Sequence, residues 1–339
     1  MAPVARGGCY ALSGLNAPPT TFPSASPSVP ESGTPVELLR GLAVLAEPPS
    51  NEHEGIIAAL GMQAPPSSSE YSDVFMFQLY PYASVHLGQE GMMGGDARER
   101  VAGFWTAVGQ TPPAEPDHLS ALLGLYVGLT EQIAIANAEG ASAEAMLLDQ
   151  SRAALMQEHL APWVFAYLDR VVELTSGPYG EWAILLRDVL RSEVTSGGAL
   201  PVHLREAPPL PDPREDGSEA FLAGLLAPVR SGAIFTRSDL GRIASTLDVG
   251  LRAGERRYAL EHILAQDAPG VLTALSEEAG RQAMAHAARE EWLGGTAHFL
   301  ANRALRTQTL LCELAESGAL SAEDAAEGKE SADTTAGVS

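Results

Sequence analysis

Residues 115–118 combine two carboxylates and an imidazole in one short stretch of the sequence. Glu115 and Asp117 lie on either side of a proline, and His118 follows directly. The apolar residues that come next recur at the spacing of a helix, which predicts a helix over residues 119–137. These apolar residues are Leu119, Leu122, Leu123, Tyr126 and Leu129. The polar residues therefore lie at the start of an apolar helix.

Two interpretations of this polar stretch are open. In the first, Pro116 ends a loop, Asp117 caps the helix with its carboxylate, and His118 lies in the first turn. In the second, Asp117 and Glu115 accept hydrogen bonds from a guanidinium of a ligand, because capping uses only part of a carboxylate's acceptor capacity. Both can hold at once. Joint acid–base catalysis by Asp117 and His118 is disfavoured, since adjacent helical residues point about 100° apart.

The usual sequence motifs of enzymes are missing. The chain has no G-x-S-x-G elbow, no H-E-x-x-H helix, no paired C-x-x-C and no G-x-G-x-x-G after a strand. Its one lysine, Lys329, lies near the end of the sequence, so the folded part lacks the lysine of a phosphate-binding loop or a Schiff base. A metal site needs three or four ligands, and the sequence shows no local pairing of His118 and His159. We therefore expect a protein that is not an enzyme and that holds no metal or cofactor.

The composition narrows the class of protein further. A chain of 339 residues with 45% hydrophobic content can bury one sizeable core and a smaller second one. A formal charge of −22 disfavours nucleic acid as a ligand and favours basic partners, although such a charge also serves solubility. We find no apolar run near the roughly 18 residues of a membrane span, and the two cysteines form no disulfide framework. These features predict a cytoplasmic protein without stable membrane insertion.

Changes in composition divide the chain into five segments. Residues 1–35 are rich in Pro, Ser, Ala and Gly and predict a disordered arm, and residues 318–339 predict a disordered acidic tail. Between them we expect a helical core over residues 36–195, an exposed acidic, proline-rich linker over residues 196–217, and a helical extension over residues 218–317. The expected fold class is all-α, a single helical bundle with a helical C-terminal extension.

Three segments of the core stand out by their order and spacing. They are residues 80–85, Tyr-Pro-Tyr-Ala-Ser-Val, residues 116–119, Pro-Asp-His-Leu, and residues 158–163, Glu-His-Leu-Ala-Pro-Trp. Together they resemble three segments of the TorD/DmsD/NarJ-type chaperones. The first is similar to the family's segment of proline, aromatic residues and serine, the second to its most recognisable motif, and the third to its pattern of His-Leu followed by Trp. These chaperones mature molybdenum-containing redox enzymes. The chain departs from the family where Ala121-Leu122 replaces a frequent Glu-Leu pair.

The resemblance covers roughly residues 36–195 and implies an all-helical bundle of the TorD type. It implies a cytoplasmic chaperone that binds the apo catalytic subunit of a molybdenum-containing oxidoreductase, or its twin-arginine signal peptide, and assists folding, cofactor insertion or export. A homodimer and a bound guanine nucleotide are features that the resemblance alone allows. On this basis the expected peptide-binding residues are Tyr80, Tyr82, Ser84, Trp105, Glu115, Asp117, His118, Leu122, Tyr126, His159 and Trp163.

The chemistry of the residues also fits such a ligand. A twin-arginine signal has two arginines followed by an apolar segment, and carboxylates at the mouth of an apolar groove complement that order. The negative charge would steer a basic peptide towards them over a Debye length of about 8 Å. The alternative function is a helix-turn-helix-like nucleic-acid regulator over residues 236–264, where Arg252, Arg256 and Arg257 cluster. The opposing interpretation is that these arginines pair with neighbouring acidic residues.

Overall fold

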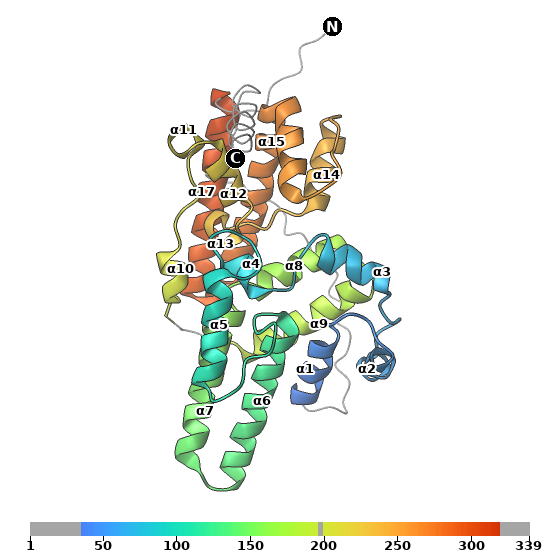
Figure 1. The fold of residues 1–339 in the computed structure, drawn as a ribbon, viewed down its shortest axis with the longest axis vertical. Helices are drawn as coiled ribbons and strands as arrows, with labels where there is room; N and C mark the ends of the chain where they lie inside the picture. The colour runs from blue at the N-terminus through green and yellow to red at the C-terminus, as the bar shows by residue number, and fades with distance from the viewer. Residues whose placement is uncertain (1–34, 196–198, 319–339) are drawn as a thin grey trace, which may run out of the picture.

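The computed structural model describes residues 35–195 and 199–318, and the regular structure within these ranges is helical (Figure 1). The one β-type contact in this described part is a single antiparallel bridge between Tyr82 and His118. The prediction of an all-α fold is confirmed. The arm predicted for residues 1–35 and the tail predicted for residues 318–339 lie, except for Pro35 and Gly318, outside the described residues.

The first part of the chain forms a helical core around α6. Helices α6 and α7 form an antiparallel hairpin that extends from the body of the protein (Figure 1). The helical structure is broken at Pro162, between the π-helical turn η2 and the start of α8, since proline cannot continue the hydrogen bonding of a helix. The elements are α1 (Pro35–Val44), α2 (Glu52–Leu60), α3 (Ser68–Tyr71), η1 (Ser72–Met76), α4 (Ala83–Leu87), α5 (Gly95–Ala107), α6 (Leu119–Ala138), α7 (Ser142–Ala154), η2 (Leu155–Leu160), α8 (Val164–Leu174) and α9 (Pro178–Glu193).

Helix α6 is long and apolar enough to cross a membrane by length and composition alone. This corrects the expectation that no apolar run approaches the required length. In the structure the bulky side of α6 packs into the first core, where Leu122, Leu123 and Leu129 are buried. Helix α1 packs along α6 and is held in turn by α9, since the indole N–H of Trp182 donates to the carbonyl of Leu42 at 2.9 Å. Helix α6 is therefore a central helix of the first core.

The last part of the chain forms a second core around the long pair α15 and α17. Thr236 caps α14 in a reciprocal capping box with Asp239, which lies three residues later in the sequence. Helix α15 is kinked at Asp267, two residues before Pro269, because proline cannot continue the hydrogen bonding of a helix. The elements are α12 (Ser218–Leu225), α13 (Pro228–Ser231), α14 (Arg237–Thr246), α15 (Arg256–Ala287), α16 (Glu290–Leu293) and α17 (Gly295–Ser317).

The segment between the two cores contains two short helices, α10 (Val202–Glu206) and α11 (Pro213–Asp216). Leu204 is fully buried in the first core, and the carbonyl of Ala207 accepts a hydrogen bond from Arg303 on α17. The expectation of an exposed linker over residues 196–217 is therefore wrong around Leu204. Apolar side chains between the prolines pack this segment against both cores. The high content of proline and acidic residues gives no sign of this packing.

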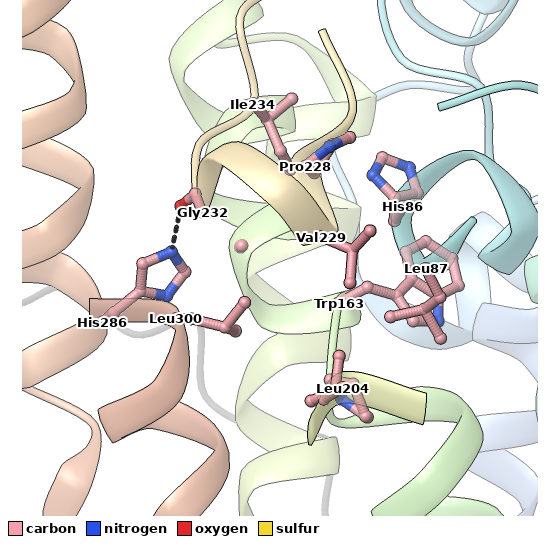
Figure 2. A pocket seen from close by; sticks show the side chains of 12 residues that line it. His86, Leu87, Trp163, Leu204, Pro228, Val229, Gly232, Ile234, His286 and Leu300 are labelled. Carbon is pink, nitrogen blue, oxygen red and sulfur yellow. Dashed lines mark hydrogen bonds between the residues drawn. The ribbon is translucent and has the colours of Figure 1, made fainter. Parts of the chain in front are cut away.

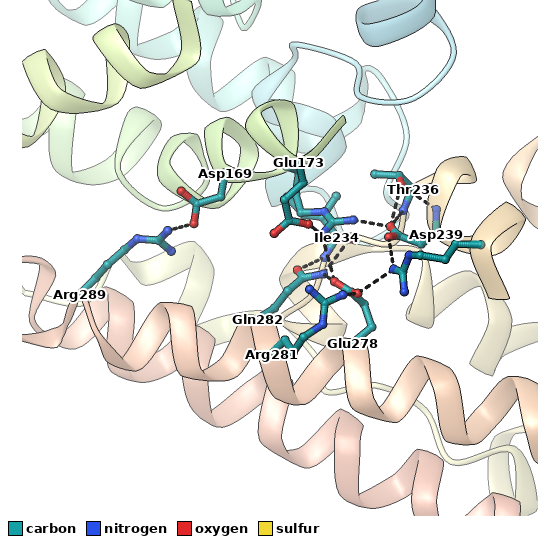
Figure 3. Close-up of polar contacts among 11 residues, drawn as sticks. Asp169, Glu173, Ile234, Thr236, Asp239, Glu278, Arg281, Gln282 and Arg289 are labelled. Carbon is teal, nitrogen blue, oxygen red and sulfur yellow. Dashed lines mark hydrogen bonds and ion pairs between the residues drawn. The ribbon is translucent and has the colours of Figure 1, made fainter. Parts of the chain in front are cut away.

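A buried charged network joins α8 of the first core to α14 and α15 of the second (Figure 3). Arg170 on α8 is 3% exposed, donates to Glu278 at 3.0 Å, and pairs with Asp239. Burial alone would raise the pKa of Asp239. The Arg170 guanidinium and hydrogen bonds from Thr236 outweigh it and hold that pKa below its usual value. Asp239 thus serves both the cap of α14 and the junction between the cores.

Candidate functional site

An open groove of about 630 Å³ runs along α6. One side of α6 forms its floor, α1 forms one wall, and Trp105 on α5 together with residues 113–115 forms the other. The indole N–H of Trp105 donates to the carbonyl of Pro116 at 3.2 Å, which holds this second wall beside the start of α6. A volume of this size lies within the range of about 300–1,000 Å³ that is usual for ligand sites.

The floor of the groove consists of small residues of α6, namely Ala121, Gly124 and Gly128. A Cβ atom added at Gly124 or Gly128 would meet no atom within 4 Å, so both glycines face open space. The opposite side of α6 carries the bulky residues Leu122 and Tyr126, which are buried in the core. These two predicted ligand contacts therefore support the floor from behind and do not line the groove.

Carboxylates form the rim of the groove. Glu131 is paired with Arg40 across it, whereas Glu47 accepts a hydrogen bond from the Ser120 hydroxyl. Glu115 accepts one from the Tyr82 hydroxyl at 2.9 Å, and burial together with this hydrogen bond raises the pKa of Tyr82 above its usual value. Among the described residues, no arginine forms an ion pair with Glu47 or Glu115. The rim therefore presents two carboxylates with acceptor capacity for a cationic ligand.

His118 lies at the end of the groove and is the N-cap of α6. Its Nδ1 atom accepts from the backbone N–H of Ser120 at 3.2 Å, so the interpretation of Asp117 as the cap is wrong. The backbone N–H of Leu119 donates to Pro81, and this strand-like pairing keeps His118 extended until the helix begins. Burial lowers the pKa of His118, and neighbouring carboxylates, Glu47 first, only partly oppose this shift. The neutral ring can therefore act as a hydrogen-bond acceptor.

Asp117 lies behind the groove and not in its lining. Its side chain is 2% exposed, and its carboxylate accepts from the backbone N–H of Ser84 at 3.0 Å. The carbonyl of Asp117 accepts from the backbone N–H of Ala83, while the Ser84 hydroxyl accepts from Gly94. Asp117 and Ser84 therefore tie the start of α4 to the residues before α6. This anchors one wall of the groove.

Replacing Asp117 with alanine should destabilise the protein by about 1–3 kcal/mol, because the buried N–H of Ser84 would lose its acceptor. Urea unfolding followed by circular dichroism measures this change. Asp117→Asn is the matched control, because its side-chain oxygen can still accept the same hydrogen bond. Equal stability of the alanine variant and the parent would contradict the anchoring role.

The remaining predicted residues lie apart from the groove lining. Tyr80 is partly exposed, and its carbonyl contacts the ring of His86. His159 packs on Phe104, and Trp163 stacks on His86 with the ring centroids 4.9 Å apart. Trp163 lines a separate cavity of about 20 Å³ between the two cores, where His286 contacts the carbonyl of Gly232 (Figure 2). A space of that size holds about one water molecule and no peptide.

The arginine cluster near α15 is largely occupied by contacts within the protein. Arg256 donates to the carbonyl of Phe235, and Arg257 pairs with Glu219 and Glu261. The interpretation that these arginines pair with neighbouring acidic residues thus describes Arg257, whereas Arg256 is held by a backbone carbonyl. Within the ranges that the structure describes, no three His, Cys, Asp or Glu side chains are grouped to hold a metal ion.

The structure adds groove residues that the motifs do not indicate, chiefly Arg40, Glu47, Gly124, Gly128 and Glu131. One signal for the floor is present in the sequence. Ala121, Gly124 and Gly128 recur at helical spacing on the side of α6 opposite the leucines. Small residues at this spacing allow close approach of another chain segment. The departure from the frequent Glu-Leu pair also falls here, since Ala121 lines the floor.

The described residues thus form an all-helical scaffold with an open groove, whose floor is made of small residues and whose rim carries carboxylates. Residues 61–168, about a third of the chain, match the family described as nitrate reductase delta subunit, so this segment is similar to that family of TorD-type redox enzyme maturation chaperones. The resemblance expected from the motifs is confirmed over these residues. Comparison with curated proteins and with solved structures gave no match. The matched residues include α6 but not α1, the other side of the groove.

Proposed function

We propose that this protein is a cytoplasmic chaperone that binds the apo catalytic subunit of a molybdenum-containing oxidoreductase. Its ligand is an apolar segment preceded by arginines, as in a twin-arginine signal peptide, and the groove along α6 holds that segment. The observation that carries this proposal is the groove itself, which combines an acidic rim with a floor of small residues, and this floor lies in the segment that matches the delta-subunit family.

The distribution of charge supports the order of such a ligand. Glu47, Glu115 and the neutral ring of His118 lie together at one end of the groove, and the floor continues along α6 towards Gly128. A guanidinium at the carboxylates would place the following apolar residues over the floor. Charge-assisted hydrogen bonds of this kind contribute more than neutral ones. The chain's formal charge of −22 favours the approach of a basic peptide at low salt.

Filling the floor tests the proposal without disturbing the core. The double variant Gly124→Leu, Gly128→Leu places two side chains in open space, and replacing glycine inside a helix also favours the helix by up to about 1 kcal/mol. We expect the variant to bind a synthetic peptide of two adjacent arginines followed by a leucine- and alanine-rich segment at least about tenfold more weakly than the parent does. Fluorescence anisotropy of the labelled peptide measures the affinity.

Gly103→Leu provides the matched control. Gly103 also lies inside a helix, α5, an added Cβ there also meets no atom within 4 Å, and the residue does not line the groove. This variant should bind the peptide with unchanged affinity. If the groove variant retains full affinity while keeping its helical circular dichroism, the peptide binds elsewhere and the proposed site is wrong.

A further inference from the structure

We propose that residues 6–15 of the chain's own N-terminal arm occupy the groove when no client is bound and compete with the client segment for it. This inference rests on the proposed function of the groove and adds its regulation. The arm lies outside the described residues, so the argument uses its sequence, its point of attachment and the groove that the structure describes.

The sequence of the arm has the order of charge and apolarity that the groove fits. Arg6 is its one basic residue, and Glu31 is its one acidic residue. The segment after Arg6, Cys9-Tyr10-Ala11-Leu12-Ser13-Gly14-Leu15, is uncharged and carries apolar residues at positions 12 and 15. A cation followed by an apolar stretch is the same pattern as in the proposed client. The arm can therefore use the same contacts.

The groove offers a matching place for each part. Arg40 already pairs with Glu131, whereas Glu47 and Glu115 form no ion pair with an arginine of the described residues. Arg6 supplies a guanidinium for these carboxylates. Leu12 and Leu15 then cover the exposed floor at Gly124 and Gly128, where open space is available for side chains.

The arm is attached beside the groove. It runs directly into α1, the helix that forms one wall through Arg40, Ala43 and Val44. Helix α1 rises about 1.5 Å per residue, so these wall residues lie roughly 8–14 Å from its first residue, Pro35. About 20 residues separate Leu15 from Pro35, and a chain of that length spans up to about 70 Å. The arm therefore reaches every part of the groove.

This attachment makes occupation by the arm intramolecular. Tethering a segment to its site gives effective concentrations in the millimolar range for short linkers, so even weak contacts fill the site. A client must then displace the arm. Its apparent association constant is the intrinsic one multiplied by the fraction of molecules in which the groove is open. An arm that fills the groove nine-tenths of the time weakens client binding about tenfold.

Crosslinking locates the arm directly. In the full chain carrying Cys312→Ser, Cys9 is the one cysteine, and it takes a benzophenone maleimide. After irradiation, mass spectrometry should place the intramolecular crosslinks on peptides that contain residues 40–47 and 113–131. The crosslinks should decrease in the variant with Gly124→Leu and Gly128→Leu and persist with Gly103→Leu. Crosslinks spread over other surfaces, unchanged by filling the groove, would overturn the proposal.

Affinity for the arginine- and leucine-containing probe peptide gives the second measurement. The variant Leu12→Asp, Leu15→Asp should bind the probe about three- to tenfold more tightly than the parent, because the arm no longer competes. Thr21→Asp, Ser26→Asp changes the arm by the same charge outside the proposed segment and should leave the affinity as it is. Equal affinity of the parent and both variants would overturn the proposal.

The two measurements separate this inference from the proposed function. If the probe peptide binds none of the proteins while Cys9 still crosslinks to the groove, the client assignment fails and the arm remains the occupant. If the probe binds equally well to all arm variants and the crosslinks avoid the groove, the client assignment stands and the competition by the arm is wrong.

Discussion

Replacing Arg170 with methionine will destabilise the protein by about 3 kcal/mol. Arg170 is 3% exposed and faces Asp239 and Glu278, whose side chains are buried as well. Removing one partner of a buried ion pair leaves a carboxylate without compensation, which typically costs about 3–5 kcal/mol. Arg242 also contacts both acids from the surface, at 2.8 and 3.2 Å, so we expect the lower end of that range.

Urea unfolding at neutral pH measures this effect, and Arg257→Met is its control. Arg257 also pairs with two glutamates but is exposed, so the same change there should cost no more than about 1 kcal/mol. In the Arg170→Met variant, Arg242 and Arg281 still contact Glu278, but the buried carboxylate of Glu278 has lost the Arg170 guanidinium. Adding Glu278→Gln to Arg170→Met should therefore recover part of the loss. Equal costs for Arg170→Met and Arg257→Met would contradict the role of Arg170 at the junction of the cores.

Lowering the pH from 7 to 5 will also destabilise the protein strongly. Burial lowers the pKa of His86, His159 and His286 to about 4 each. A nearby arginine lowers each pKa further, Arg256 for His86, Arg100 for His159 and Arg289 for His286. Their usual pKa in an unfolded chain is about 6.5. Unfolding therefore takes up protons between pH 6.5 and 4, and stability is lost as the pH falls through this window. Each ring contributes about 2 kcal/mol of this loss at pH 5.

The variant His86→Phe separates one of these contributions. Phenylalanine can keep the stack on Trp163 but cannot take up a proton, so the slope of stability against pH should fall by about 1 kcal/mol per unit near pH 5. At pH 8 the ring is neutral in both states, and the difference between the variant and the parent reports packing and the lost contact with Tyr80. Parallel pH profiles would show that His86 does not contribute to the acid lability.

The sequence predicted α6 closely because its signal is local. Leucines at helical spacing define the buried side, and the expected helix over residues 119–137 differs from α6 by one residue at its end. The cap was assigned to the wrong residue because aspartate is the commoner capping side chain. The bridge between Tyr82 and His118 decides the boundary, and that bridge joins residues far apart in the sequence.

The groove could be predicted only in part for the same reason. Of the predicted peptide-binding residues, Glu115, Trp105 and His118 line the groove, whereas Leu122 and Tyr126 face the core. Apolar residues that recur every 3.6 residues show that a helix has an apolar side and a second side. They do not show which neighbouring element covers either side. That choice depends on α1 and the residues just after it, since Arg40 and Glu47 come more than 70 residues before α6. The Arg170 network is likewise hidden, because its partners lie 69 and 108 residues away.

The packing of α1 on α6 has a consequence for how the protein stays in solution. By composition α6 could reside in lipid, and its leucines are kept from water by α1 and the rest of the first core. A fragment cut at the boundaries of the matched segment, residues 61–168, would lose α1 and expose to water the surface of α6 that α1 covers. Helix α1 thus protects the protein against aggregation and also forms a wall of the groove.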